Sequence, residues 1–121
     1  MKSIFSRYST AIVKSMAAAV LLGCSAETLA GSVANVTVNH IEALPSGHFF
    51  VYFSSSITSS PACATLPATA FVVDGSTAGG KVVVALIQEA YALGKTISGS
   101  GSNTCTLHTG YETISDIFTT N

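Results

Sequence analysis

The chain has 121 residues and a formal net charge of −1, and 48% of its residues are hydrophobic while only 9% are charged. This length allows one domain. The apolar content excludes an intrinsically disordered chain, because such chains are rich in charge and poor in apolar residues.

Residues 1–30 have the pattern of a bacterial secretory signal peptide. Lys2, Arg7 and Lys14 come early in the chain, the apolar run of residues 16–22 follows, and no acidic residue occurs before Glu27. The apolar run is shorter than the roughly 20 residues of a membrane-spanning helix. We therefore expect export to the periplasm or the outside, with no transmembrane segment in the mature chain; the alternative is an amphipathic or buried N-terminal helix.

Two processing sites are compatible with this signal. Cleavage after Ala30 would release a soluble protein that begins at Gly31, with residues 31–121 as a single small domain. Alternatively, residues 21–24 resemble a lipobox, in which Cys24 would carry a lipid and anchor the protein to the envelope. We favour the soluble product because Leu22 is bulkier than that position usually carries.

Removal of residues 1–30 would change the charge balance. From Gly31 onward the chain has Lys81, Lys95 and no arginine, against five acidic residues, which gives a formal net charge of −3. Two lysines cannot form the basic stripe that phosphate backbones require. We expect neither nucleic acid nor an anionic membrane surface as a partner.

Two cysteines, Cys63 and Cys105, remain after Gly31. In an oxidising compartment such a pair in a small domain predicts a disulfide, worth roughly 4 kcal/mol by chain entropy. The alternative is a metal site that these cysteines share with His40, His48 or His108. It lacks the close C-x-x-C or H-x-x-x-H spacing of such sites, so we assign no metal ligand.

The residues that precede the predicted helix indicate three strands. Residues 33–42 alternate in part, with Val36, Val38 and His40 on one side, and residues 44–47 form a turn. Residues 48–54 are rich in aromatic and β-branched residues and should form a central strand covered on both faces. A polar connection, residues 54–68, holds Cys63, and residues 69–74 form the third strand.

The stretch from 77 to 93 predicts one amphipathic helix. Ser76 or Thr77 is the expected N-cap, and Gly94 is expected to end the helix in the left-handed conformation. A polar stripe and an apolar stripe recur at helical spacing. The polar stripe comprises Lys81, Ala85, Gln88, Ala92 and Lys95, and the apolar stripe comprises Val83, Leu86, Ile87, Ala90 and Leu93.

Two further strands, residues 95–100 and 112–120, complete the pattern βββαββ, with residues 101–103 as a turn. This order predicts a mainly β fold with one helix. We favour a small OB-like Greek-key barrel because the second strand is apolar on both faces. The alternative is an open antiparallel α+β sheet with one packed helix.

The same residues carry a resemblance to a group of small, exported, mostly uncharacterised bacterial proteins. It rests on Gly80-Lys81, Ala85-Leu86, Ala90, Gly94-Lys95, Gly99, Gly101, Cys105 and Glu112-Thr113-Ile114. More distantly, the strand order, disulfide and helix are similar to the pentameric B subunit of subtilase cytotoxin. That resemblance implies an OB-fold, ring assembly and glycan binding, but no sugar-contacting position can be matched to a residue here.

No catalytic or cofactor-binding residue is assigned. His108, Glu112 and Asp116 could be written as an acid, a base and an orienting group, but no nucleophile accompanies them. Glu112 and Asp116 are expected as surface groups on an edge strand. Residues 99–102 resemble part of a phosphate loop, but no helix follows, so we expect a turn.

These observations predict an exported, non-enzymatic binding or interaction module without a cofactor. A glycan or another exported protein is the candidate partner, and a homo-oligomeric ring is the candidate assembly. Tyr52, Tyr91 and Tyr111 with exposed hydroxyls could form a sugar platform, although for any one of them we favour a packing role. An envelope lipoprotein anchored through Cys24 is the second hypothesis and a small hydrolase the third.

Overall fold

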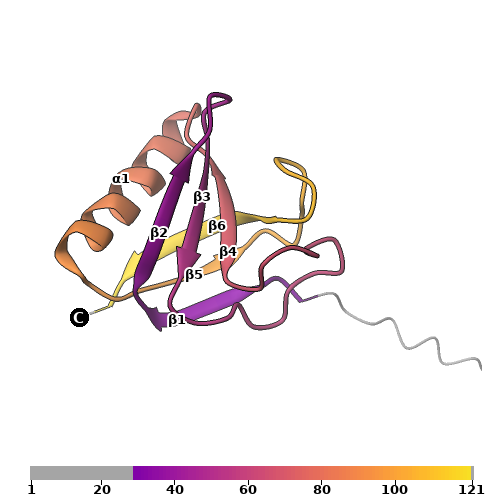
Figure 1. The fold of residues 1–121 in the computed structure, drawn as a ribbon, viewed down its shortest axis with the longest axis horizontal. Helices are drawn as coiled ribbons and strands as arrows, with labels where there is room; N and C mark the ends of the chain where they lie inside the picture. The colour runs from indigo at the N-terminus through magenta and orange to yellow at the C-terminus, as the bar shows by residue number, and fades with distance from the viewer. Residues whose placement is uncertain (1–28, 121) are drawn as a thin grey trace, which may run out of the picture.

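The computed structural model describes residues 29–120, which form one six-stranded sheet and one helix (Figure 1). The strands are β1 (Ser32–Val36), β2 (Val38–Ala43), β3 (His48–Phe53), β4 (Ala70–Asp74), β5 (Ile97–Gly101) and β6 (Glu112–Thr119), and α1 (Ala78–Leu93) follows β4. The predicted mainly β class with a single helix is therefore confirmed. Residues 1–28, which include most of the predicted signal and Cys24, lie outside the described residues.

The strands lie in the order β1-β5-β6-β4-β3-β2. Every neighbouring pair is antiparallel except β4 and β6, which are parallel. The two edge strands, β1 and β2, follow each other in the chain, so the sheet is strongly curved (Figure 1). The sheet is not closed, so the favoured OB-like barrel was wrong. The fold corresponds to the alternative, an open α+β sheet with one packed helix, except that the β4–β6 pair is parallel rather than antiparallel.

The predicted first strand is divided into β1 and β2 at Thr37. The Thr37 amide donates to Ser54 Oγ, and its carbonyl accepts from the Ser54 amide, so this residue leaves the ladder. Asn35 has a φ of 52°, and the β2–β3 register shifts between Val38 and His40. The shift changes the alternation, so His40 is exposed while Val38 is buried.

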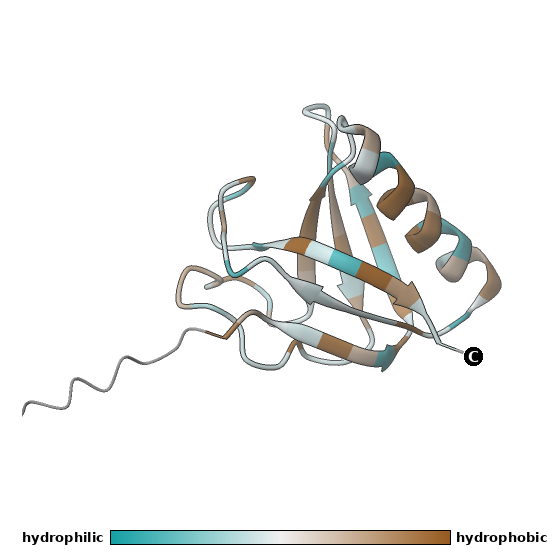
Figure 2. Ribbon diagram, turned by 180° about the vertical axis from the view of Figure 1, so that it is seen from behind, coloured by the Kyte–Doolittle hydropathy of each residue, from teal (hydrophilic) through white to brown (hydrophobic). Residues whose placement is uncertain are grey.

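The main core lies between α1 and one face of the sheet. Val51 and Phe53 of β3 pack with Phe71 of β4 and with buried residues of α1. In Figure 2, brown hydrophobic and teal hydrophilic residues alternate along this helix, as expected for an amphipathic helix. No helix of residues 29–120 is long and apolar enough to span a membrane.

The buried stripe of α1 agrees in part with the predicted one. Ile87 and Ala90 are buried as predicted, but Val84 is buried as well and Leu93 is 60% exposed. Leu93 follows Val84 by nine residues, and at 3.6 residues per turn this separation places the two side chains on opposite sides of the helix. The predicted polar stripe is exposed throughout.

A second apolar layer lies on the other face of β3 and β4. Phe50, Ala70 and Val72 are buried but do not belong to the core that contacts the helix. Figures 1 and 2 show α1 on one side of these strands and the β5–β6 loop, residues 102–111, on the other. This loop brings aromatic residues to the face that the helix leaves open.

Candidate functional site

Aromatic side chains from three segments meet on the face of β3 opposite the helix. The ring centroid of Phe50 lies 4.4 Å from that of Tyr111 and 4.9 Å from that of His108, and His108 and Tyr111 are 5.4 Å apart. The rings of His40 and Tyr52 are 5.3 Å apart. We call these five residues the aromatic patch.

The strand register explains the β2 and β3 part of the patch. His40 pairs with Tyr52, and Glu42 pairs with Phe50. Since side chains alternate along a strand, Phe50 and Tyr52 point away from the face that carries Val51. Phe50 is 5% exposed and forms the floor of the patch, while His40 and the Glu42 carboxylate are exposed.

The β5–β6 loop positions the other two patch residues. Gly110 has a φ of 87°, a conformation that favours glycine, and its carbonyl accepts a hydrogen bond from the Leu66 amide. The Tyr111 amide in turn donates to the His108 carbonyl at 3.2 Å. These bonds hold the tip of the loop against the connection between β3 and β4, residues 54–69, which we call the 54–69 connection.

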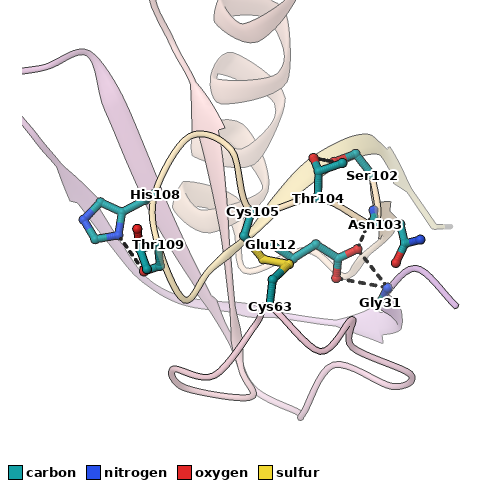
Figure 3. The surroundings of a disulfide bond; sticks show 9 residues. All are labelled: Gly31, Cys63, Ser102, Asn103, Thr104, Cys105, His108, Thr109 and Glu112. Atoms are coloured by element: carbon teal, nitrogen blue, oxygen red, sulfur yellow. Dashed lines mark hydrogen bonds between the residues drawn. A yellow bond between two sulfur atoms is a disulfide. The ribbon is translucent and has the colours of Figure 1, made fainter. Parts of the chain in front are cut away.

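The predicted disulfide between Cys63 and Cys105 is present, with the Cα atoms 6.0 Å apart. Figure 3 shows that it joins the 54–69 connection to the β5–β6 loop. Because the two cysteines are bonded to each other, they cannot act as thiolate ligands in the metal site that was considered from the sequence. No cluster of His, Cys, Asp or Glu suited to a metal occurs among the described residues.

The hydroxyl group of Tyr52 stays neutral over a wide range of pH. A side-chain hydrogen bond with Tyr111 raises the pKa of Tyr52 to about 12, and burial and the charge of Glu42 act in the same direction. A hydrogen bond that raises the pKa stabilises the protonated form, so the Tyr52 hydroxyl donates the hydrogen bond to Tyr111. The patch thus combines apolar ring faces with polar edges and the neighbouring Glu42 carboxylate.

A pocket of about 330 Å³ lies elsewhere, between the start of α1 and β6. Its lining includes Thr77, Gly80 and Leu107, together with Thr113, whose buried hydroxyl has no hydrogen-bond partner within residues 29–120. Asp74 also lines it, but its carboxylate accepts bonds from the amide and hydroxyl of Ser76, and these bonds lower the pKa of Asp74. The pocket therefore offers mainly apolar and backbone atoms.

The structure corrects the prediction for Glu112. Its side chain is 1% exposed, and β6 lies between β5 and β4 rather than at an edge. Asp116 is exposed on the same interior strand and accepts a hydrogen bond from Ser100 Oγ. The prediction failed because a charged residue in a short polar segment gives no local sign of burial.

The three residues considered as an acid, a base and an orienting group are not brought together. Figure 3 shows His108 pointing away from the Glu112 carboxylate, and Nδ1 of His108 lies 3.1 Å from the Thr109 carbonyl. Asp116 is engaged with Ser100 on the neighbouring strand. These side chains do not form a catalytic constellation.

The predicted sugar platform is divided by the fold. Tyr52 and Tyr111 meet in the aromatic patch, whereas Tyr91 lies on α1 and is 51% exposed. His40, Phe50 and His108 were not predicted as partners of these tyrosines. The aromatic residues on both faces of the second predicted strand were the available signal, but only the folded loop shows what covers the outer face.

Gly99 and Ser100 belong to β5, as the predicted strand 95–100 implied, and this strand also includes Gly101, which was expected in the turn. A Cβ on Gly101 would lie 2.1 Å from the Glu112 carboxylate. A Cβ on Gly99 would lie 2.5 Å from the Asp116 carbonyl. These glycines permit close approach of β5 and β6, which is a packing role.

Comparisons with known proteins found no matching family model, no matching curated protein and no matching solved structure. The resemblance to small exported bacterial proteins and to the toxin B subunit therefore remains an expectation from the sequence.

Proposed function

We propose that the protein is an exported, non-enzymatic binding module and that its aromatic patch binds a glycan. The observation that supports this proposal is the meeting of Tyr52, Tyr111, His40 and His108 around the buried Phe50. The proposal also draws on the expected export and on the resemblance to a glycan-binding toxin subunit.

The chemistry of the patch suits a sugar. Apolar ring faces can stack on the C–H surface of a pyranose, while tyrosine hydroxyls and imidazole nitrogens can bond to its hydroxyl groups. The Glu42 carboxylate lies close enough to Tyr52 to influence its pKa and can accept bonds from sugar hydroxyls. A partly exposed patch with a polar rim is the general form of such a binding site.

Binding fits the patch better than hydrolysis does. Hydrolysis of a glycosidic bond generally needs two carboxyl groups on opposite sides of the bond. Glu42 is the carboxylate beside the patch, whereas Glu112 is buried in hydrogen bonds to the backbone. The patch can therefore hold a sugar without supplying an acid and a base together.

A glycan array probed with micromolar mature protein tests the proposal. We expect binding to a defined subset of glycans. His40→Ala and Tyr52→Leu should each weaken the affinity at least about tenfold, because loss of a central aromatic contact costs more than about 1.4 kcal/mol. Tyr91→Ala is the matched control on the opposite face, and it should leave the affinity unchanged.

Two outcomes would contradict the proposal. The first is the absence of any glycan signal from a correctly folded protein. The second is a similar loss of affinity in the Tyr91→Ala control and in the patch variants. The mass of the native assembly, measured on the same sample, tests the expected ring separately.

A further inference from the structure

The buried carboxylate of Glu112 has an unusual set of partners. Both of its oxygens lie 3.0 Å from the Gly31 amide nitrogen, and Oε1 also lies 2.8 Å from the Asn103 amide nitrogen. Figure 3 shows the carboxylate directed at these two backbone groups beside the disulfide. Within residues 29–120, the hydrogen bonds that reach Glu112 come from backbone amides, which carry no formal charge.

A carboxylate that is 1% exposed normally has a cationic partner, because removal of an unpaired charge from water is costly. The lysines of the described residues, Lys81 and Lys95, are both exposed on or just after α1. Neither supplies a positive charge at this place. The nitrogen nearest to both carboxylate oxygens belongs to Gly31.

Gly31 is also the residue that the sequence predicts as the first of the mature protein. We propose that cleavage after Ala30 converts the Gly31 nitrogen into an α-ammonium group, and that this group becomes the buried ionic partner of Glu112. This inference rests on the proposed export, since removal of the leader creates the new amino group. Position in the fold and the cleavage pattern in the sequence point independently to the same nitrogen.

The chemistry of the step is simple. A leader peptidase hydrolyses the Ala30–Gly31 bond with one water molecule, which leaves a carboxylate on Ala30 and an amine on Gly31. The amine takes up a proton at neutral pH. An amide has one hydrogen for two carboxylate oxygens, whereas an ammonium can donate one hydrogen to each and form a charge-assisted pair.

The surroundings of Gly31 hold its nitrogen in position. The Gly31 carbonyl accepts a hydrogen bond from the Gly101 amide at 2.8 Å, which fixes the residue beside β5. A Cβ on Gly31 would lie 2.4 Å from Glu112 Oε2, so only glycine allows this close approach. Leu29 is 61% exposed, so the chain passes from the surface to the interior across the predicted cleavage site.

The full chain, exported with its own leader from a bacterial host, provides the test. We expect an intact mass that corresponds to a first residue at Gly31. Acylation with acetic anhydride at neutral pH should then modify the α-amino group at least about tenfold more slowly in the folded protein than in urea, since reaction requires local opening. The exposed Lys81 and Lys95 serve as internal references, because they should react at similar rates in both conditions.

Variants sharpen this test. Glu112→Gln keeps the shape of the side chain but removes the charge, and it should abolish most of the protection of the α-amino group. Glu89→Gln, an exposed carboxylate on α1, is the matched control and should preserve the protection. If Glu112→Gln does not fold, the ratio of the rates in the native protein and in urea still decides the matter.

The outcomes separate this inference from the proposed function. A mature chain that begins at Cys24 with a lipid adduct, or at any residue other than Gly31, overturns the ion pair and leaves the glycan test unaffected. A chain that begins at Gly31 but whose α-amino group reacts as fast as in urea overturns the ion pair alone. Failure of the glycan array does not affect either measurement.

Discussion

The hydrogen bond between Tyr52 and Tyr111 in the aromatic patch can be detected through the pKa of Tyr52. The pKa of Tyr52 in the folded protein is raised to about 12, whereas a tyrosine in the unfolded chain titrates near its ordinary pKa of 10.0. Between these values the unfolded chain loses the Tyr52 proton and the folded chain retains it. The contribution of Tyr52 to stability is therefore present below about pH 10 and is lost as the pH rises through about 12.

We predict that Tyr111→Phe lowers the pKa of Tyr52, because it removes the hydroxyl that accepts the Tyr52 proton. The alkaline loss of stability should then become smaller. The tyrosinate absorbance, followed as a function of pH in the folded protein, measures this shift, and Tyr91→Phe is the control. An unchanged Tyr52 titration in Tyr111→Phe would contradict the assigned hydrogen bond.

Among the secondary-structure elements, α1 follows local sequence rules most closely. The Thr77 hydroxyl accepts a hydrogen bond from the Gly80 amide at 3.0 Å, and Gly94 ends the helix with a φ of 62°. Both caps were predicted, since N-caps and left-handed glycine C-caps depend on neighbouring residues. The buried face of the helix was predicted less well, because packing against the sheet determines which side chains are covered.

We predict that Thr77→Ala lowers the free energy of unfolding by about 1 kcal/mol, because the Gly80 amide loses its partner. Thr77→Ser should retain most of the stability, since it keeps the hydroxyl group. Urea unfolding of the two variants and the native protein provides the measurement. Equal stability of the alanine and serine variants would show that the cap does not contribute.

In the molecule as a whole, the disulfide connects two loops that lie outside the strands of the sheet. It joins Cys63 in the 54–69 connection to Cys105 in the β5–β6 loop, across a sequence separation of 42 residues. The same loop carries His108 and Tyr111 of the aromatic patch. The disulfide therefore links global stability to the geometry of the proposed glycan site.

We predict that the double substitution Cys63→Ser and Cys105→Ser lowers the free energy of unfolding by about 4 kcal/mol, because the unfolded chain gains loop entropy. Urea unfolding of the oxidised protein and the variant measures the difference. The exposed Ser102→Ala in the same loop is a control that should change the stability little. Two thiols should appear together when the native protein is reduced.

Local patterns in the sequence were sufficient for the single helix and its caps, for the positions of the later strands, and for the cysteine pair. The helix, its caps and the strands depend on neighbouring residues. The cysteine pair follows because Cys63 and Cys105 are the two cysteines after Gly31. The division of the first strand at Thr37 was not predictable, because it results from backbone bonds to Ser54. The open order of the sheet likewise depends on long-range pairing between β4 and β6.

Only the tertiary structure determined what surrounds each side chain. The sequence by itself identified tyrosines and histidines, but the return of the β5–β6 loop over β3 is what gathers His108 and Tyr111 around Phe50. In the same way, an ordinary glutamate in a polar segment becomes the buried Glu112 because β6 is an interior strand against β5. Residues far apart in the chain form both sites, so no local pattern could reveal them.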